Sequence, residues 1–304
     1  MTDFKIHILG CGSALPTTRH LPSSQIVDLR DKLYMIDCGE GTQLQMRHMR
    51  IRFSRLNHIF ITHLHGDHCL GLPGLISTLG MLGRRGDLMI HGPQEVESYL
   101  SFILDSFCKD LPYKVRFNTV DPFAYSLVME DRSVQVYSLP LKHRIPCCGY
   151  LFVEKAKEAH IIREMIDFYQ VPVRSIKEIK EGADFITPEG VVVPNARLTR
   201  PAAPIRRYAY CSDTAYNPAI VPYIKEVDLL YHEATFGEKE KARAKETFHS
   251  TARQAAQIAT QAEVKRFVIG HYSARYDDLS PLLQEAQEVY KDTLLGNEGM
   301  VISL

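Results

Sequence analysis

The chain has 304 residues and a mass of 34.6 kDa, a length that corresponds to two ordinary domains or to one domain with duplicated halves. With 45% hydrophobic and 24% charged residues, it can form a core without covalent staples, which excludes global disorder. Lys plus Arg (36) balances Asp plus Glu (36). This balance excludes nucleic-acid binding through bulk positive charge, but it is compatible with a local basic face.

The start of the chain and its cysteines favour a cytoplasmic protein. Asp3 stands where a signal peptide carries positive charge, and no long apolar segment follows it. No stretch approaches the roughly 18 consecutive apolar residues of a membrane span. The seven cysteines are odd in number and include no Cys-x-x-Cys pair, as expected for buried thiols in a reducing compartment. We therefore expect a cytoplasmic protein without a membrane partner.

Strand-like runs and helical patterns alternate along the chain. In the first half, strands are predicted at Lys5–Leu9, Gln25–Leu29, Lys32–Ile36, His58–Thr62, Leu88–His91, Lys114–Val120 and Ser133–Leu139, and helices at Leu70–Leu82 and Gln94–Phe107. In the second half, strands are predicted at Arg207–Cys211, Val227–Tyr231 and Arg266–Ile269, and helices at Asn217–Ile224, Ser250–Ala262 and Pro281–Thr293. This alternation predicts an α/β or α+β fold with large mixed sheets.

One segment interrupts this alternation. Residues 154–206 are rich in charge, with an amphipathic helix predicted near Lys157–Tyr169 and a strand near Gly190–Val193. A segment of roughly 50 residues is too long for a plain loop in a compact domain. We predict an inserted arm with a small structure of its own.

A dense group of metal-binding residue types follows the predicted strand that ends at Thr62. The sequence there reads His63-Leu-His65-Gly-Asp67-His68. Extended backbone directs residues two apart to the same side, so His63 and His65 can bind one ion together. Asp67 and His68 lie around the next bend, where they can face a second ion. Imidazoles combined with a carboxylate are a ligand set typical of Zn²⁺.

The same local design recurs downstream, because three further strands each end in a residue that binds metals. These residues are His143, Asp213 and His271. Strand ends of one polarity gather at one edge of a sheet, where α/β proteins place their sites. Asp213 has two carboxylate oxygens and can bridge two ions. Each of these residues alone is compatible with a structural role, but together with the first group they predict a two-metal site.

The complete pattern, His63-x-His65-x-Asp67-His68 with His143, Asp213 and His271, is similar to the signature of the metallo-β-lactamase superfamily. Finer motifs resemble ribonuclease Z (tRNase Z), the tRNA 3′-processing endonuclease. They are Ile8–Pro16, Asp37–Gln43, Gly71–Gly74, Cys211–Thr214, His232–Phe236, His249–Thr251 and His271–Tyr276. They follow the family order and cover nearly the whole chain apart from the arm.

This resemblance implies a single domain over residues 1–304, an αβ/βα four-layer sandwich, with residues 154–206 as a tRNA-binding exosite. It implies two zinc ions per subunit, with the ligands His63, His65, His143 and Asp213 for one and Asp67, His68, Asp213 and His271 for the other. It also implies that Asp67 accepts a proton during catalysis. The expected partners are precursor tRNA and a second subunit, in a homodimer in which one subunit's arm clamps tRNA for the other. The expected reaction is removal of the 3′ trailer after the discriminator base, which leaves a 3′-hydroxyl on the tRNA and a 5′-phosphate on the trailer.

His249 is the second catalytic candidate. It precedes a predicted helix start, where Ser250 or Thr251 is available as the N-cap, and the resemblance makes it a proton donor to the leaving group. A helix N-terminus disfavours an imidazolium, so a nearby carboxylate or the phosphate has to compensate. Glu233 is a candidate for this role, although it is also compatible with a structural hydrogen-bonded pair with His232.

RNA contacts have to come from local charge. No Asp or Glu lies between Gly41 and Gly66, where Arg47, Arg50, Arg52 and Arg55 cluster; this cluster is either a solvated face or a path for acceptor-stem phosphates. Two alternatives remain for the function: a small-substrate hydrolase of the same superfamily, such as a phosphodiesterase or lactonase, and an RNA-binding scaffold without catalysis.

Overall fold

The computed structural model describes residues 4–304, so Asp3 lies outside the described residues. The chain forms two compact units: a body that ends at Val153 and resumes at Arg206, and an arm of Glu154–Ile205. Within the described residues, no helix combines the length and the apolar character needed to cross a membrane.

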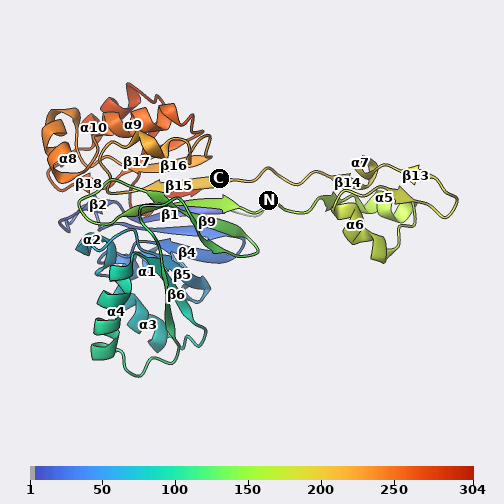
Figure 1. Ribbon diagram of the computed structural model, residues 1–304, viewed down its shortest axis with the longest axis horizontal. Helices are drawn as coiled ribbons and strands as arrows, with labels where there is room; N and C mark the ends of the chain where they lie inside the picture. The colour runs from blue at the N-terminus through green and yellow to red at the C-terminus, as the bar shows by residue number, and fades with distance from the viewer. Residues whose placement is uncertain (1–3) are drawn as a thin grey trace. The chain divides into compact units, whose positions relative to one another are not determined.

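Two seven-stranded mixed sheets form the centre of the body (Figure 1). The first sheet has the strand order β20 (Val301–Ser303), β1 (Phe4–Gly10), β3 (Ser24–Leu29), β4 (Lys32–Ile36), β5 (Leu56–Phe60), β6 (Leu88–Gly92) and β7 (Val115–Thr119). The second has the order β19 (Thr293–Leu295), β17 (Phe267–Gly270), β16 (Leu229–Glu233), β15 (Arg207–Cys211), β10 (Cys148–Glu154), β9 (Val134–Pro140) and β8 (Leu127–Glu130). Each sheet contains a parallel run, β4 to β7 in the first and β15, β16, β17 and β19 in the second.

The two sheets pack face to face through one buried apolar cluster to which both contribute. The rings of Phe60 on β5 and Phe152 on β10 meet edge to face, with centroids 5.4 Å apart, and Phe152 also contacts Tyr34 on β4. The alternating burial along β1 and β9 gives each strand an inner apolar face. This shared core brings the ends of strands from both halves to the same edge of the body.

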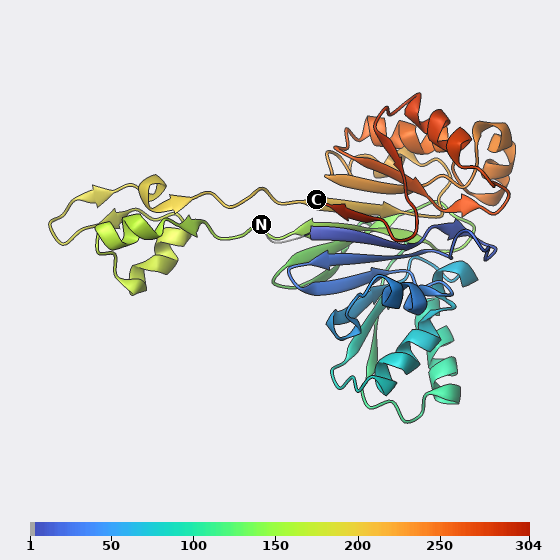
Figure 2. The same ribbon diagram turned by 180° about the vertical axis from the view of Figure 1, so that it is seen from behind.

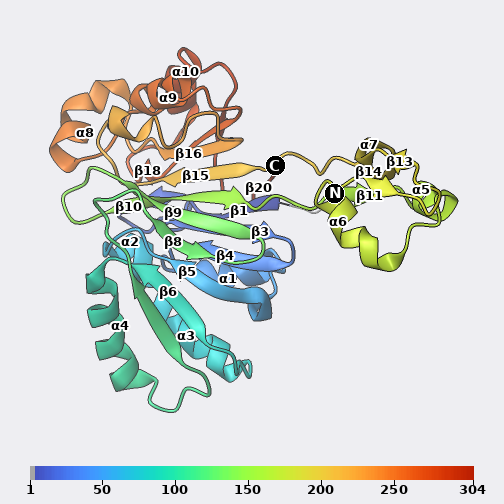
Figure 3. The same cartoon turned by 45° about the vertical axis from the view of Figure 1, so that its right-hand side comes forward.

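Helices cover the outer faces of both sheets (Figures 1 and 3). The helices of the first half are α1 (Thr42–His48), α2 (Gly66–Cys69), α3 (Leu72–Met81) and α4 (Gln94–Phe107), and those of the second are α8 (Lys241–Thr247), α9 (Ala252–Gln261) and α10 (Ser280–Gln287). A second apolar cluster lies between the first sheet and α1, α3 and α4. The N-cap of α9 is Thr251, which forms a capping box with Gln254. The layers are therefore helix, sheet, sheet and helix.

The two ends of the described chain meet in the first sheet. Strand β20 pairs with β1 in antiparallel register, with Lys5 opposite Ser303 (Figure 2). A two-stranded pair, β2 (Gly12–Ser13) and β18 (Tyr272–Ser273), links the beginning of the chain to the segment after β17.

The arm has a small apolar core of its own, formed by Val171, Ile179, Phe185, Val193 and Leu198. Its elements are β11 (His160–Ile161), α5 (Arg163–Phe168), a 3-10 turn (Val173–Ser175), α6 (Ile176–Lys180), β12 (Phe185–Ile186), β13 (Val192–Val193), α7 (Asn195–Leu198) and β14 (Thr199–Arg200). Strand β11 pairs with β14, and β12 pairs with β13.

Three predicted helices differ from the structure. The segment Asn217–Ile224 forms only a 3-10 turn, Pro218–Ile220, because Pro222 has no N–H to continue a helix. The helix predicted over Pro281–Thr293 ends at Gln287, and Thr293 begins β19. In the arm, only Arg163–Phe168 of the predicted Lys157–Tyr169 is helical. Strand β10 was not predicted, because it is buried on both faces and shows no alternation.

Candidate metal centre

The first part of the centre is an extended segment that continues β5. Ile61 N donates to His91 O at 2.8 Å, and Thr62 O accepts from Cys148 N at 3.2 Å, so the backbone stays extended beyond the strand. As a result, His63 and His65 project to the same side, and His63 Nε2 lies 2.9 Å from His65 Nδ1.

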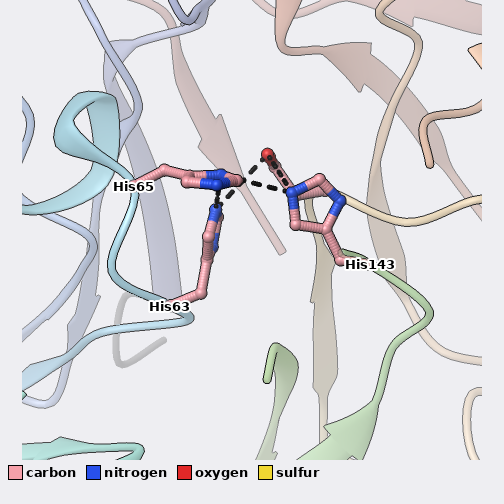
Figure 4. Close-up of side chains that lie close together, drawn as sticks. His63, His65 and His143 are labelled. Atoms are coloured by element: carbon pink, nitrogen blue, oxygen red, sulfur yellow. Dashed lines mark hydrogen bonds and ion pairs between the residues drawn. The ribbon is translucent and has the colours of Figure 1, made fainter. Parts of the chain in front are cut away.

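His143 and Asp213 complete this first group. His143 follows β9, and its Nε2 lies 3.2 Å from His65 Nδ1. Asp213 follows β15, and its Oδ2 lies 3.5 Å from His63 Nε2 and 3.7 Å from His143 Nε2. The rings of the three histidines point toward one another (Figure 4). The candidate ligand atoms of all four residues lie within 4.8 Å of one another.

A second group lies on the other side of Asp213. His68 on α2 and His271 after β17 place their Nε2 atoms 3.2 and 2.9 Å from Asp213 Oδ1. Asp67 Oδ2 lies 3.5 Å from the Nε2 atoms of both histidines. The two oxygens of Asp213 therefore face two different groups, as a bridging carboxylate requires. The structure thus brings together all seven side chains that the sequence indicated as ligands.

Hydrogen bonds at the outer edge of the centre fix the orientation of the imidazoles. His143 Nδ1 donates to Phe248 O at 3.1 Å, and His68 Nδ1 donates to Asp37 Oδ2 at 2.8 Å. Burial lowers the pKa of His143 to about 4, so this ring is neutral and its Nε2 carries a lone pair that points toward the imidazole of His65. Converging lone pairs repel one another unless a cation lies between them, so the donor set fits a metal ion.

The electrostatics of the second group also favour a cation. Burial lowers the pKa of His271, but the charge of Asp213 and its hydrogen bond outweigh burial and raise the pKa to about 10. His68 shows the same competition, and the nearby carboxylates raise its pKa well above the usual value. These carboxylates thus stabilise positive charge at the point where the second group of ligand atoms meets.

Asp37 is a supporting residue to which the sequence analysis assigned no role. Its buried carboxylate accepts hydrogen bonds from Thr62 N and Oγ1, from His68 Nδ1 and from Tyr210 OH. It follows β4 in a left-handed conformation, with φ of 55°. Its signal in the sequence was the Asp37–Gln43 motif and its position at a strand end, the same kind of position that identified Asp213.

His249 lies beside the second group, two residues before the N-cap of α9. Its Nδ1 donates to Glu233 Oε1 at 2.8 Å, and Glu233 is fully buried. Burial lowers the pKa of His249, but the charge of Glu233 outweighs burial, so the pKa is raised. Glu233 therefore supplies the carboxylate needed to offset the helix N-terminus. Its side chain pairs with His249 rather than with His232, whose Nδ1 donates to the Glu233 backbone carbonyl.

A cavity of about 290 Å³ opens over the centre. Asp67, Asp213, His249 and His271 line it, together with Arg144, a cationic residue that the sequence analysis did not select. The cavity thus gives a substrate access to both ligand groups and to His249.

The arginine cluster lies elsewhere. Arg47 and Arg52 line a separate cavity of about 660 Å³ near the start of β5, together with Arg84 and Arg85. Arg55 is paired with Asp28. The metal centre lies beyond the other end of β5, so a ligand that contacts both places has to extend along the five-residue strand, a length of about 17 Å.

Two sheets between two helical layers, with a His/Asp centre at the strand ends, define a protein of the metallo-β-lactamase fold. A metallo-β-lactamase fold protein of Bacillus subtilis superposes with a TM-score of 0.69 at 16% identity, over 99% of this chain and 100% of that one. A family model described as anti-Pycsar protein Apyc1 matches residues 4–100.

Closer relatives define the family. The ribonuclease Z of Parabacteroides distasonis is 75% identical over 304 residues, which are 100% of both chains. The short form of human tRNase Z superposes with a TM-score of 0.70 at 26% identity, over 98% of each chain. The chain belongs to the ribonuclease Z family and is accordingly an enzyme, a nuclease of the hydrolase class. The predicted fold class and the family resemblance are confirmed.

Proposed function

We propose that the chain is a zinc-dependent endoribonuclease that removes the 3′ trailer from precursor tRNA in the cytoplasm. Cleavage after the discriminator base leaves a 3′-hydroxyl on the tRNA and a 5′-phosphate on the trailer. The observation that carries this proposal is Asp213, whose two oxygens face two groups of ligand atoms beneath one cavity. The substrate class is supported by the relatives named ribonuclease Z and tRNase Z.

Two zinc ions per subunit fit the donor set. The ligands would be His63, His65, His143 and Asp213 for one ion and Asp67, His68, Asp213 and His271 for the other. Bound there, zinc supplies Lewis-acid charge beside the scissile phosphate and lowers the pKa of water.

Asp67 is the proposed proton acceptor. Its Oδ2 accepts a hydrogen bond from Ala14 N at 2.7 Å and faces His68 and His271. The side chain lines the cavity, where it can take the proton of an attacking water while its position is held from both sides.

His249 is the proposed proton donor. Because Nδ1 donates to Glu233, Nε2 is the nitrogen available to the substrate. An imidazolium stabilised by a buried carboxylate can give its Nε2 proton to the 3′-oxygen that leaves as the phosphodiester breaks. Glu233 is itself held by N–H groups of Thr214 and Ser250, so its carboxylate fixes the orientation of the ring.

Substrate binding beyond the centre is assigned to the arm and to a second subunit. The arm combines a core of its own with exposed charged side chains, such as Arg163 and Lys177, and we propose it as the tRNA-binding exosite. The homodimer is proposed from the family resemblance, and exposed apolar side chains such as Leu44, Leu70 and Met81 are available for an interface. Light scattering after size-exclusion chromatography tests the dimer.

The direct test is incubation of the protein with a 3′-extended precursor tRNA and Zn²⁺ or Mn²⁺, followed by mapping of the product ends. We expect one cut after the discriminator base, and we expect Asp67→Ala to abolish it. Absence of cleavage, or equal cleavage by the Asp67→Ala variant, contradicts the proposal.

Removal of the arm separates this function from that of a small-substrate hydrolase. Val153 and Arg207 are paired neighbours on β10 and β15, so a short turn can replace residues 155–205. We expect this variant to lose tRNA cleavage but to keep hydrolysis of bis(p-nitrophenyl) phosphate. Unchanged tRNA cleavage would assign the RNA specificity to the body.

A further inference from the structure

A partly buried carboxylate near the end of the chain lies at the base of the loop Ala14–Leu21. Glu298, between β19 and β20, accepts hydrogen bonds through Oε1 from Leu21 N at 2.8 Å and from Cys11 N at 3.2 Å. Its Oε2 accepts from His20 Nδ1 at 3.0 Å. The Glu298 side chain is only 16% exposed. It belongs to neither ligand group, and the proposed chemistry does not use it.

The loop that Glu298 holds at its base forms one wall of the catalytic cavity. Ser13, Ala14 and Pro16 line this cavity. Ala14 adopts a left-handed conformation, with φ of 57°, and its N–H donates to Asp67 Oδ2 at 2.7 Å. The position of the loop therefore determines whether this N–H reaches the proposed proton acceptor.

The base of the loop is packed too closely to shift alone. A Cβ atom at Gly10 would lie 1.8 Å from Pro22 O, and Gly12 N donates to Leu21 O at 2.9 Å. The His20 ring also packs against Tyr272, with centroids 5.7 Å apart. A displacement of the base is therefore passed on to the backbone that carries Ala14.

We propose that Glu298 is a positioning residue that holds the loop Ala14–Leu21 so that the Ala14 N–H stays on Asp67. Glu298 accepts hydrogen bonds from two backbone N–H groups and one imidazole that would otherwise bond to water. These bonds connect the segment before β20 to the loop near the start of the chain. The inference rests on the proposed catalytic role of Asp67.

The same cluster resembles a metal site, since the candidate ligand atoms of Cys11, His20 and Glu298 lie within 4.8 Å of one another. Hydrogen bonds account for the geometry without an ion, because donors already occupy both oxygens of Glu298. Burial and the charge of Glu298 raise the pKa of the Cys11 thiol well above its usual value, which disfavours the thiolate that zinc requires.

The test compares Glu298→Ala with Asp131→Ala. Asp131 is a matched control, because its carboxylate accepts from two backbone N–H groups, of Ser133 and Val134, and from the Lys32 ammonium, and it is 21% exposed. It lines none of the cavities described above. With bis(p-nitrophenyl) phosphate as substrate and Zn²⁺ present, we expect Glu298→Ala to lower kcat about tenfold, with KM changed less than about twofold.

The controls distinguish positioning from general stability. Asp131→Ala should lower Tm to a similar extent but keep kcat, and Glu298→Gln, which retains an oxygen for the N–H groups, should restore most of kcat. Hydrogen exchange should accelerate at the amides of residues 12–21 in Glu298→Ala and not in Asp131→Ala. If Glu298→Ala does not fold, His20→Ala, which removes one donor, should give the same loop exchange and a smaller loss of kcat, about threefold.

Several results would overturn the inference: unchanged loop exchange in the variant that folds, an equal kcat loss in Asp131→Ala, or a third zinc ion that is lost in Cys11→Ser. Hydrogen exchange in the loop is measured without substrate, so it tests whether Glu298 holds the loop even if the chain shows no activity. If Glu298→Ala accelerates exchange in the loop but the unchanged chain does not cut precursor tRNA, the positioning role of Glu298 is supported and the proposed substrate is contradicted.

Discussion

The half of the body built on the first sheet supplies its four candidate ligands from one short segment, residues 63–68, whereas the half built on the second sheet supplies three from the ends of three separate strands. His143 follows β9, Asp213 follows β15 and His271 follows β17. The first set is local, so a short stretch of sequence determines its spacing. The second set depends on the register of a whole sheet. The centre therefore combines one short segment of sequence with residues whose positions depend on the folded second sheet.

Asp213 is the residue at which these two contributions meet, so its loss should have the largest effect. We expect Asp213→Ala to lose both ions and to reduce precursor-tRNA cleavage by about 10⁴-fold or more, because residues that act as a unit fail together. His63→Ala, which removes a ligand of one group only, should retain one ion per chain. Elemental analysis of both purified variants decides, and two ions in Asp213→Ala would refute the bridging role.

His249 belongs to the second half but is not among the seven candidate ligands. We expect His249→Ala to keep its metal content and to reduce kcat by about 10³-fold, since general acid catalysis contributes 10²–10⁴-fold. Single-turnover cleavage of precursor tRNA measures the effect. A substrate with a better leaving group should be much less affected, and an equal loss on both substrates would argue against proton donation.

Substitution of Asp37 tests whether the residues 63–68 adopt their positions without help from residues distant in the sequence. Asp37→Asn removes the charged acceptor for His68 Nδ1, and we expect a loss of about 10- to 100-fold in metal affinity. Competition with a zinc chelator measures this, with Asp131→Asn as a control for loss of a hydrogen-bonded carboxylate. Unchanged affinity would mean that the loop orients His68 without help from β4.

His91 provides a prediction that concerns stability rather than catalysis or metal binding. Its ring stacks on Phe60, with centroids 4.4 Å apart, and burial lowers its pKa to about 3 from 6.5. Below pH 6.5 His91 takes up a proton in the unfolded chain but not in the folded one. The contribution of His91 to the free energy of unfolding is therefore largest above pH 6.5. The free energy of unfolding then declines by about 1.4 kcal/mol per pH unit as the pH falls toward 3.

Denaturant unfolding of the metal-free protein at several pH values tests this prediction. His91→Gln should show a shallower loss of unfolding free energy between pH 6 and 4 than the unchanged chain. His160→Gln, at an exposed position of the arm, should follow the unchanged chain. Parallel slopes for the unchanged chain and His91→Gln would place the titration elsewhere.

The same division explains which parts of the molecule could be predicted. The candidate ligands His63 to His68 and the capped helix after His249 were visible because their signals are local. The role of Asp37 was not, because it joins residues distant in the chain, and Glu233 was only one of two candidates for the group that compensates His249. Strand β10 was not predicted because both of its faces are buried, so its sequence does not alternate between apolar and polar residues. A helix was predicted at Asn217–Ile224 because the apolar periodicity was given more weight than Pro222, and only a short 3-10 turn forms there.

The paired ends of the arm have a consequence for how the molecule can change. Within the second sheet, the antiparallel strands β10 and β15 form a β-hairpin in which Val153 lies opposite Arg207. The arm is the loop that connects these two strands. Closure entropy grows only with the logarithm of loop length, by about 0.6 kcal/mol per doubling. Lengthening, shortening or exchanging this loop is therefore thermodynamically cheap for the body. A nuclease built this way can exchange its arm for a different insertion without rebuilding its candidate metal centre.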